Sequence, residues 1–202
     1  MSTGAPVDFY FEFSSPYGYI AAERADEFEK RLGRPLAWHA TLLGPVFKMT
    51  GGAPLTAIPM KGDYSKRDFV RSARFHGVPF EPPRNFPINS VAACRAFYWA
   101  QDRDPAQAKA LAKALYRAFF AQGKDISAPA TVVEVAQSQG LDDAALAAAL
   151  EDPALKERTK RAVDEAIGRG VFGSPFFVID GEPFWGVDRM PMAEEWVRRG
   201  GW

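Results

Sequence analysis

Segments with the pattern of a β-strand lie only near the two ends of this chain. The first two cover residues 7–13 (VDFYFEF) and 34–41 (RPLAWHAT), and the last two cover residues 175–180 (PFFVID) and 182–185. Between the last two, Asp180 and Gly181 have the composition of a two-residue hairpin turn. Residues 42–174 are typical of helix or irregular chain. Any single sheet must therefore join the two ends of the sequence.

The first strand is followed at once by a strong helix-start signal. Ser15 is suited to cap a helix, and Pro16 is suited to its first position, where a missing N–H costs nothing. Apolar residues then recur on one face as far as Leu32, and Gly33 is a typical terminator. With the strand at residues 34–41, this start of the chain predicts a right-handed βαβ unit.

The middle of the chain predicts mostly helices. Residues 42–86 are rich in Gly and Pro and are expected to be irregular, with a short helix near residues 65–75. Further helices are predicted near residues 89–101, 105–122, 128–139, 142–151, 153–168 and 191–199. This order predicts an α/β thioredoxin-like fold, in which a mixed sheet carries a large all-helical insertion. We expect a discontinuous thioredoxin-like domain from residues 1–42 and 155–202, with residues 43–154 as the insertion.

Composition limits the chemistry and the location. Lys+Arg and Asp+Glu each number 25, so net charge does not favour nucleic acid or an anionic membrane as partner. No apolar run approaches the ~20 residues that cross a bilayer, and the N-terminus lacks the pattern of a secretion signal. The one cysteine, Cys94, allows neither an intrachain disulfide nor a CxxC redox pair. We expect a cytoplasmic protein with a buried, unreactive Cys94 and no metal site.

Ser15 is the first candidate for chemistry. A hydroxyl at a helix N-terminus lies among free N–H groups and at the positive end of the helix dipole, where an anion is stabilised. The alternative is that Ser15 only caps the helix, although both roles are compatible. An acyl-transfer triad is not expected, because the sequence has no G-x-S-x-G motif and its only histidines are His39 and His76.

Three further segments offer candidate residues. Ser174-Pro175 precedes the third strand, where the proline is either cis, with a preceding backbone free to bind an extended peptide, or part of a simple tight turn. Asp188 precedes the last helix, where it either caps the helix or pairs with a ligand ammonium group. Lys61 is a predicted loop cation between Pro and Gly, and most such lysines are solvated.

Together these segments resemble the 2-hydroxychromene-2-carboxylate isomerases and the related kappa-class glutathione transferases. Three motifs carry the resemblance: DFYFEFSSPYGYI at residues 8–20, KGDYSKRD at residues 61–68 and GVFGSPFFVIDGEPFWGVDRM at residues 170–190. The resemblance spans nearly the whole chain. It departs at Gly51-Gly52-Ala53, where relatives often carry an asparagine that contacts the ligand.

The resemblance implies glutathione as cofactor and a role for each matching residue. Ser15, flanked by Pro16 and Tyr17, would hydrogen-bond the glutathione sulfur. Ser174, before a cis Pro175, would pair with the cysteinyl backbone. The γ-glutamyl end would meet Val187 and Asp188, and Lys61 would contact another part of the tripeptide. The resemblance also implies a homodimer that acts on a small electrophile.

Our first functional interpretation is therefore a glutathione-dependent isomerase that converts 2-hydroxychromene-2-carboxylate to trans-o-hydroxybenzylidenepyruvate in aromatic catabolism. The first alternative is a kappa-class-like glutathione transferase. An alternative of another class is a non-enzymatic thioredoxin module that binds glutathione or a peptide. A disulfide oxidoreductase is excluded because the chain has only one cysteine.

Overall fold

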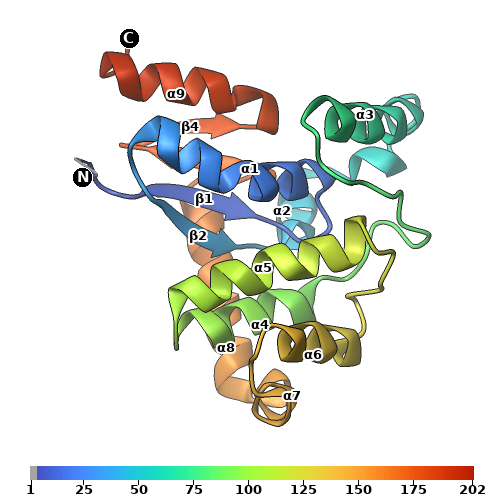
Figure 1. Cartoon of the computed structure of the whole chain (residues 1–202). Helices are drawn as coiled ribbons and strands as arrows, with labels where there is room; N and C mark the ends of the chain where they lie inside the picture. The colour runs from blue at the N-terminus through green and yellow to red at the C-terminus, as the bar shows by residue number, and fades with distance from the viewer. Residues whose placement is uncertain (1–3) are drawn as a thin grey trace.

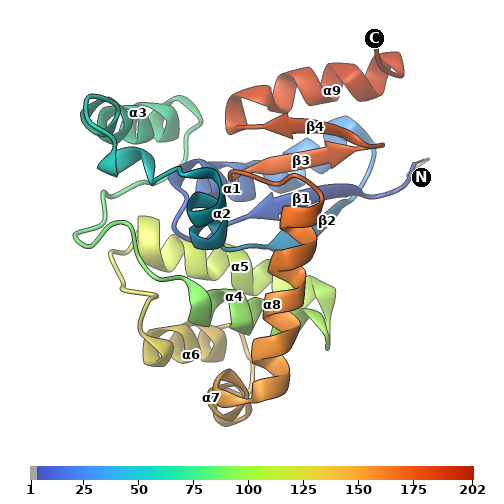
Figure 2. The ribbon, with the colours of Figure 1, turned by 180° about the vertical axis from the view of Figure 1, so that it is seen from behind.

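The two ends of the chain meet in one mixed sheet. In the computed structural model, which describes residues 4–202, the strands are β1 (Val7–Phe11), β2 (Leu36–Ala40), β3 (Phe176–Ile179) and β4 (Glu182–Trp185). They lie in the order β2-β1-β3-β4 (Figure 1), and all four are labelled in the view from behind (Figure 2). β1 pairs with β2 in parallel and with β3 antiparallel, and β3 pairs with β4 antiparallel. The predicted thioredoxin-like mixed sheet is confirmed.

Helices α1 and α9 pack near one face of this sheet. α1 (Pro16–Leu32) begins after its cap Ser15 and ends where Gly33 adopts a left-handed conformation with φ 64°, as predicted. α9 (Met190–Arg199) follows a short 3₁₀ turn, Val187–Arg189. In Figure 1, α1 is drawn in front of the sheet and α9 lies above β4, and the two helices are in contact. Beneath α1, Phe28 packs against Phe177 of β3, with 5.1 Å between ring centroids.

The remaining helices form the insertion and lead back to the sheet. They are α2 (Leu43–Thr50), the 3₁₀ turn Leu55–Ala57, α3 (Lys61–Phe75), α4 (Val91–Gln101), α5 (Pro105–Phe120), α6 (Pro129–Ser138), α7 (Asp143–Glu151) and α8 (Pro153–Gly168). Viewed from behind, α8 runs from this bundle up to the sheet (Figure 2). Within residues 4–202, no helix combines the length and the apolarity that crossing a bilayer demands.

Two expectations about local structure were wrong. Residues 42–60 are not simply irregular, because α2 occupies Leu43–Thr50. The sequence signal was hidden by Pro45, which stands in the first turn, where a helix does not need its N–H. Lys61 is not a loop residue but the first residue of α3. The predicted boundary at residue 155 lies inside α8, and the division into two domains stays a prediction.

A continuous cluster of buried apolar side chains runs from the sheet into α4 and α5. Phe11 of β1 is at its centre: its ring meets those of Trp38 on β2, Phe97 on α4 and Tyr116 on α5 at centroid distances of 5.1–6.0 Å. Cys94 of α4 lies in the same cluster and is fully buried, as predicted. The sheet and these two helices therefore share one core.

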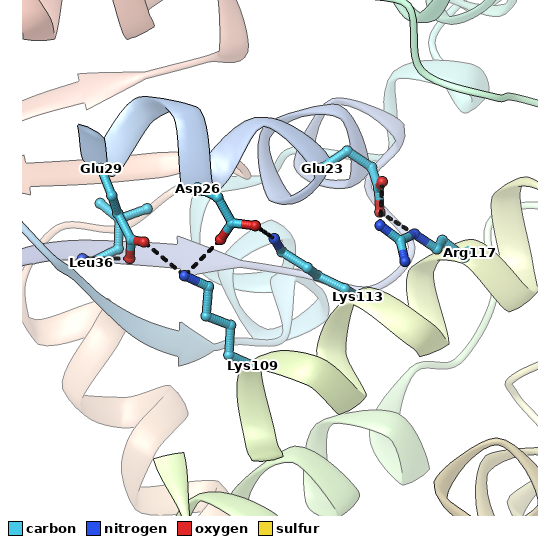
Figure 3. Close-up of polar contacts among 7 residues, drawn as sticks. All are labelled: Glu23, Asp26, Glu29, Leu36, Lys109, Lys113 and Arg117. Carbon is cyan, nitrogen blue, oxygen red and sulfur yellow. Dashed lines mark hydrogen bonds and ion pairs between the residues drawn. The ribbon is translucent and has the colours of Figure 1, made fainter. Parts of the chain in front are cut away.

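A row of ion pairs joins α1 to α5 on the surface of this core (Figure 3). Arg117 binds both carboxylate oxygens of Glu23 at 2.8 Å. Asp26 accepts from Lys113 at 2.7 Å and from Lys109 at 2.9 Å, and Lys109 also binds Glu29 at 2.7 Å. Each pair lies at the molecular surface and includes at least one partly buried side chain. Surface ion pairs stabilise a protein by only about 0.2–1 kcal/mol each. Their main effect is therefore to set how α5 lies along α1.

We predict that Lys113→Gln raises the pKa of Asp26, which the hydrogen bond from Lys113 and the one from Lys109 lower to about 2. Because the pKa of the folded state lies below the unfolded value of about 3.9, this stabilisation is present above about pH 4 and is lost as the pH falls toward 2. NMR titration of the carboxyl group measures the shift. Lys156→Gln, which removes an ion pair to Glu151 elsewhere, is the control and should leave Asp26 unchanged.

Candidate active site

A large cleft lies where β1 ends and α1 begins. Its volume is about 1220 Å³, larger than the ~300–1,000 Å³ of a typical small-ligand pocket. One wall comes from the segments that precede α1, β3 and α9, and the opposite wall comes from α2, α3 and the chain before α4. The wall formed by the segments before α1, β3 and α9, together with the first residues of α1, contributes Glu12, Ser14, Ser15, Pro16, Tyr17, Gly173, Ser174, Val187, Asp188 and Arg189.

Ser15 caps α1 and faces the cleft. Its Oγ accepts a hydrogen bond from the Gly18 N–H at 3.0 Å and donates one to the Ser174 carbonyl oxygen at 2.9 Å. The peptide bond between Ser174 and Pro175 is cis, one of the two alternatives that the sequence left open. Both serines are nearly buried. Residues that are far apart in sequence thus meet at the positive end of the α1 dipole.

Further hydrogen bonds tie the same segments together. The backbone N–H of Glu12 donates to Ser174 Oγ at 3.0 Å, and the buried Tyr116 hydroxyl of α5 donates to the Glu12 carbonyl oxygen at 2.8 Å. Gly18 fits beside them because it has no side chain: a Cβ there would lie 2.6 Å from both Ser174 Oγ and the Tyr116 hydroxyl. We call Glu12, Ser15, Gly18, Tyr116 and Ser174 the polar cluster.

Most of the predicted site residues lie along this cleft. Pro16, Tyr17, Val187 and Asp188 contribute to its lining together with Ser15 and Ser174. Pro175 is buried behind Ser174. Lys61 is exposed and lies outside the lining. Asp188 does not cap α9 and instead pairs with its neighbour Arg189 at 2.8 Å.

The hydroxyl of Tyr17 binds α3. It donates to Asp68 Oδ2 at 2.5 Å, and burial together with this hydrogen bond raises the pKa of Tyr17. Asp68 also accepts from Ser72 at 3.3 Å and pairs with Arg71. Burial opposes ionisation of Asp68, but the hydrogen bonds from Tyr17 and Arg71 lower its pKa. Tyr17 therefore fixes α3 against the start of α1.

Sequence reasoning missed the carboxyl group of Glu12. Its Oε2 accepts from the backbone N–H of Ser14 at 3.0 Å and from Ser14 Oγ at 2.7 Å, and its Oε1 accepts from Ser90 Oγ. Burial raises the pKa of this carboxyl, while the hydrogen bonds from Ser90 and Ser14 lower it. The sequence did offer a signal for Glu12: it is a glutamate within an aromatic strand, two residues before the pair Ser14-Ser15. Nothing in the sequence pointed to Ser90.

Neither histidine belongs to the cleft. His39 pairs with Asp8 at 2.7 Å on the sheet, and His76 stands at the C-terminal end of α3. Cys94 is buried in α4, and burial, with a smaller effect of Glu12, raises the pKa of its thiol. Residues 4–202 contain no group of three His, Cys, Asp or Glu side chains placed to hold a metal ion. The cleft itself thus offers hydroxyl and carboxyl groups for chemistry.

The wall opposite Ser15 is mostly apolar. It is built by the following side chains from α2, the 3₁₀ turn, α3 and the chain before α4: Leu42, Leu43, Phe47, Leu55, Ile58, Phe69, Phe86, Pro87 and Ile88. At the mouth, Phe172 and Trp185 pack edge to face at 4.9 Å and are half exposed. The site therefore combines a polar, anion-stabilising end with an apolar chamber.

Comparison with known proteins shows relatives along nearly the whole chain. A model of the family described as DSBA-like thioredoxin domain matches residues 6–198. The 2-hydroxychromene-2-carboxylate isomerase of Pseudomonas putida is 31% identical, over 96% of this chain and 94% of that protein. Glutathione S-transferase kappa 2 of Caenorhabditis elegans is 29% identical, over 95% of this chain and 91% of that protein.

Solved structures show the same arrangement. A structure of 2-hydroxychromene-2-carboxylate isomerase superimposes with a TM-score of 0.86 at 31% identity, and the match covers 96% of this chain and 94% of that one. A probable DsbA oxidoreductase from Streptomyces coelicolor superimposes with a TM-score of 0.78 at 21% identity, covering 97% and 91%. At that identity the second match shows a shared fold alone.

We predict that Gly18→Ala destabilises the protein by about 1–3 kcal/mol, because the new Cβ would overlap two buried oxygens of the polar cluster. Gly168→Ala is the matched control, since a Cβ at that helical glycine meets nothing within 4 Å. We expect the control to stay within about 0.5 kcal/mol of the wild type. Chemical denaturation of both variants measures the difference, and equal midpoints would show that the cluster tolerates the methyl group.

Proposed function

This chain belongs to the DSBA-like thioredoxin domain family, and we propose that within it the protein is a glutathione-dependent isomerase. The proposed reaction converts 2-hydroxychromene-2-carboxylate to trans-o-hydroxybenzylidenepyruvate. The observation that carries the proposal is the position of Ser15. Its hydroxyl lies at the N-terminus of α1, beside the cis Ser174–Pro175 bond and at the edge of a cleft large enough for two small molecules.

The residues around Ser15 fit a ligand that carries a thiolate. A free thiol has a pKa near 8.5, so little of it is ionised at neutral pH. A hydroxyl donor and the positive end of a helix both stabilise the charged form, and helix-start cysteines have low pKa values for the same reason. Because this chain has no cysteine in the cleft, the thiol comes from the ligand.

The Ser15 hydroxyl can exchange one acceptor for another when the ligand binds. In the structure its hydrogen points to the Ser174 carbonyl oxygen, 2.9 Å away. A thiolate is charged and therefore a stronger acceptor than a carbonyl. Rotation of this one O–H bond toward the sulfur frees the Ser174 carbonyl to accept from the cysteinyl N–H of the ligand. The backbone contact and the sulfur contact thus form together.

The other polar groups suit the rest of the tripeptide. Asp188 and Arg189 form an exposed ion pair at the edge of the cleft, and we assign the γ-glutamyl ammonium and carboxylate to this pair, next to Val187. Pro16 and Tyr17 line the cleft beside the sulfur position. Lys61, at the start of α3 and outside the lining, reaches the ligand only through its long side chain.

Bound glutathione supplies a nucleophile that adds reversibly to a conjugated double bond, which allows rotation about that bond with no net redox change. The protein holds both partners. Ser15, Ser174 and the Asp188–Arg189 pair hold the tripeptide. The apolar wall of α2 and α3 accepts a flat aromatic oxo-acid. The chamber excludes water from the reacting carbon atoms, which strengthens each hydrogen bond that stabilises developing charge.

A kappa-class-like glutathione transferase is the second candidate, favoured by the similarity to glutathione S-transferase kappa 2. A non-enzymatic glutathione-binding module is the alternative of another class. Incubation of the protein with 2-hydroxychromene-2-carboxylate and a small amount of glutathione distinguishes these three candidate functions. An isomerase turns over many substrate molecules without consuming glutathione, a transferase consumes one glutathione for each product, and a binding module gives no product.

We predict that Ser15→Ala raises the pKa of the bound glutathione thiol by about one to two units. The variant loses one hydrogen bond to a charged group, worth roughly 1.5–3 kcal/mol, and 1.36 kcal/mol corresponds to one pKa unit. Ultraviolet absorbance of the thiolate, recorded against pH, measures this shift. Turnover at neutral pH should fall more than affinity, because the backbone contacts remain.

Ser15→Ala also loses the cap of α1, so its stability must be measured separately. We expect its free energy of unfolding to fall by about 1 kcal/mol. Ser127→Ala, on an exposed turn outside the cleft, is the control and should titrate like the wild type. An unchanged thiolate titration in a folded Ser15→Ala variant would show that Ser15 is only a helix cap.

We predict that Cys94→Ser keeps most of the activity. The thiol lies in the core of α4 and outside the cleft lining, and burial raises its pKa, so it is neither accessible nor ionised. Steady-state kinetics on the folded variant checks this. Loss of turnover with unchanged stability would instead place Cys94 in the mechanism.

A further inference from the structure

The Glu12 carboxyl is a buried ionisable group that contributes to the cleft lining. Glu12 is only 5% exposed, and none of the ion pairs among residues 4–202 includes it. Within the described part of the chain, its two oxygens accept from one backbone N–H and from the hydroxyls of Ser14 and Ser90. A carboxylate held by neutral donors in a buried place takes up a proton more readily than an exposed one. Glu12 is therefore a ready proton acceptor.

The titratable groups that face Glu12 cannot share this role. Tyr116 of α5 and Cys94 of α4 are fully buried, and burial first, then the charge of Glu12, raises the pKa of each. Both therefore stay neutral at physiological pH. Of these three groups, the Glu12 carboxyl is the one that can take up a proton, because a neutral phenol and a neutral thiol do not act as bases.

Two hydroxyl groups connect the Glu12 carboxyl to the cleft. Ser14 and Ser90 both donate to it and both contribute to the cleft lining, but Ser90 is almost completely buried while Ser14 is partly exposed. A serine hydroxyl that donates one hydrogen bond still has lone pairs to accept another. Ser14 and Ser15 line the same cleft, and Ser14 Oγ lies 2.7 Å from Glu12 Oε2. Ser14 is therefore the more accessible of the two hydroxyls that join the cleft to Glu12.

We propose that Glu12 takes up, through Ser14, the proton that the glutathione thiol loses when it binds at Ser15. This inference rests on the proposed function. In the transfer, Ser14 Oγ accepts the thiol proton while its own hydroxyl proton moves to Glu12 Oε2. The S–H bond breaks and the carboxyl O–H bond forms. No electrons are exchanged with any other reagent, and the charge of the site is conserved.

Electrostatics favours this transfer over release of the proton to solvent. If the proton left, a carboxylate and a thiolate would lie close together at the same helix end, where two like charges disfavour each other. When Glu12 takes the proton, a single negative charge moves from the carboxyl to the sulfur, where Ser15 and the α1 dipole stabilise it. The two groups then share one proton and titrate as a pair.

Proton counting tests the proposal directly. Calorimetric titration with glutathione in buffers of different ionisation enthalpy gives the number of protons released, and ultraviolet absorbance gives the amount of thiolate formed. S-methylglutathione, which has no thiol proton, reports protons that come from the rest of the tripeptide. After this correction, we expect the wild type to release almost no proton for each thiolate formed.

Glu12→Gln removes the acceptor and keeps the shape. The amide oxygen can accept from Ser14 and the amide N–H₂ can donate to Ser90, so the buried hydrogen bonds are retained. We expect this variant to release about one proton for each thiolate formed. Glu134→Gln, which removes an exposed partner of Lys124 far from the cleft, should release almost none, like the wild type.

The outcomes separate the two proposals. Release of about one proton per thiolate by the wild type, or equal release by the wild type and Glu12→Gln, overturns the role of Glu12 and leaves the proposed function intact. If glutathione does not bind, or binds as a thiol, both proposals fail. If Glu12→Gln does not fold, the proton count of the wild type decides alone.

Discussion

The antiparallel pairing of β1 with β3, extended by hydrogen bonds between the segment after β1 and the segment before β3, determines how the two ends of the chain meet. The Glu12 N–H binds Ser174 Oγ, and Ser15 Oγ binds the Ser174 carbonyl oxygen. Both bonds are buried, and a buried polar group without a partner is costly. The start of α1 and the cis Ser174–Pro175 segment are therefore held in one relative position. Because the candidate site lies at this junction, the fold sets the geometry of the site.

The helical insertion supports this junction from below and encloses it from the side. Tyr116 of α5 reaches through the core to the Glu12 carbonyl oxygen, while the ion pairs on the surface align α5 with α1. On the other side, the bond from Tyr17 to Asp68 holds α3 over the cleft. The insertion thus encloses the end of the sheet where β1 stops, in a cleft with one polar and one apolar wall.

Several features were readable because their causes are local. The Ser15-Pro16 start and Gly33 end of α1, the Asp180-Gly181 turn and the burial of Cys94 follow from capping, turn and periodicity rules that involve neighbouring residues only. The ion pairs between α1 and α5 also had a signal: Glu23, Asp26 and Glu29 recur every three residues, and Lys109, Lys113 and Arg117 every four. Each set lies on one helix face, but only the fold shows that the faces meet.

The sequence alone determined the type of the fold and the cap of α1, Ser15, which lines the candidate site. Strand pattern and helix caps act within short stretches of chain. Tertiary structure decided what each polar group does. It turned the Tyr17 hydroxyl to Asp68, set Lys61 outside the cleft lining and placed Ser90 on the Glu12 carboxyl. Such choices depend on which distant donor reaches a buried acceptor, and therefore on packing that no local pattern records.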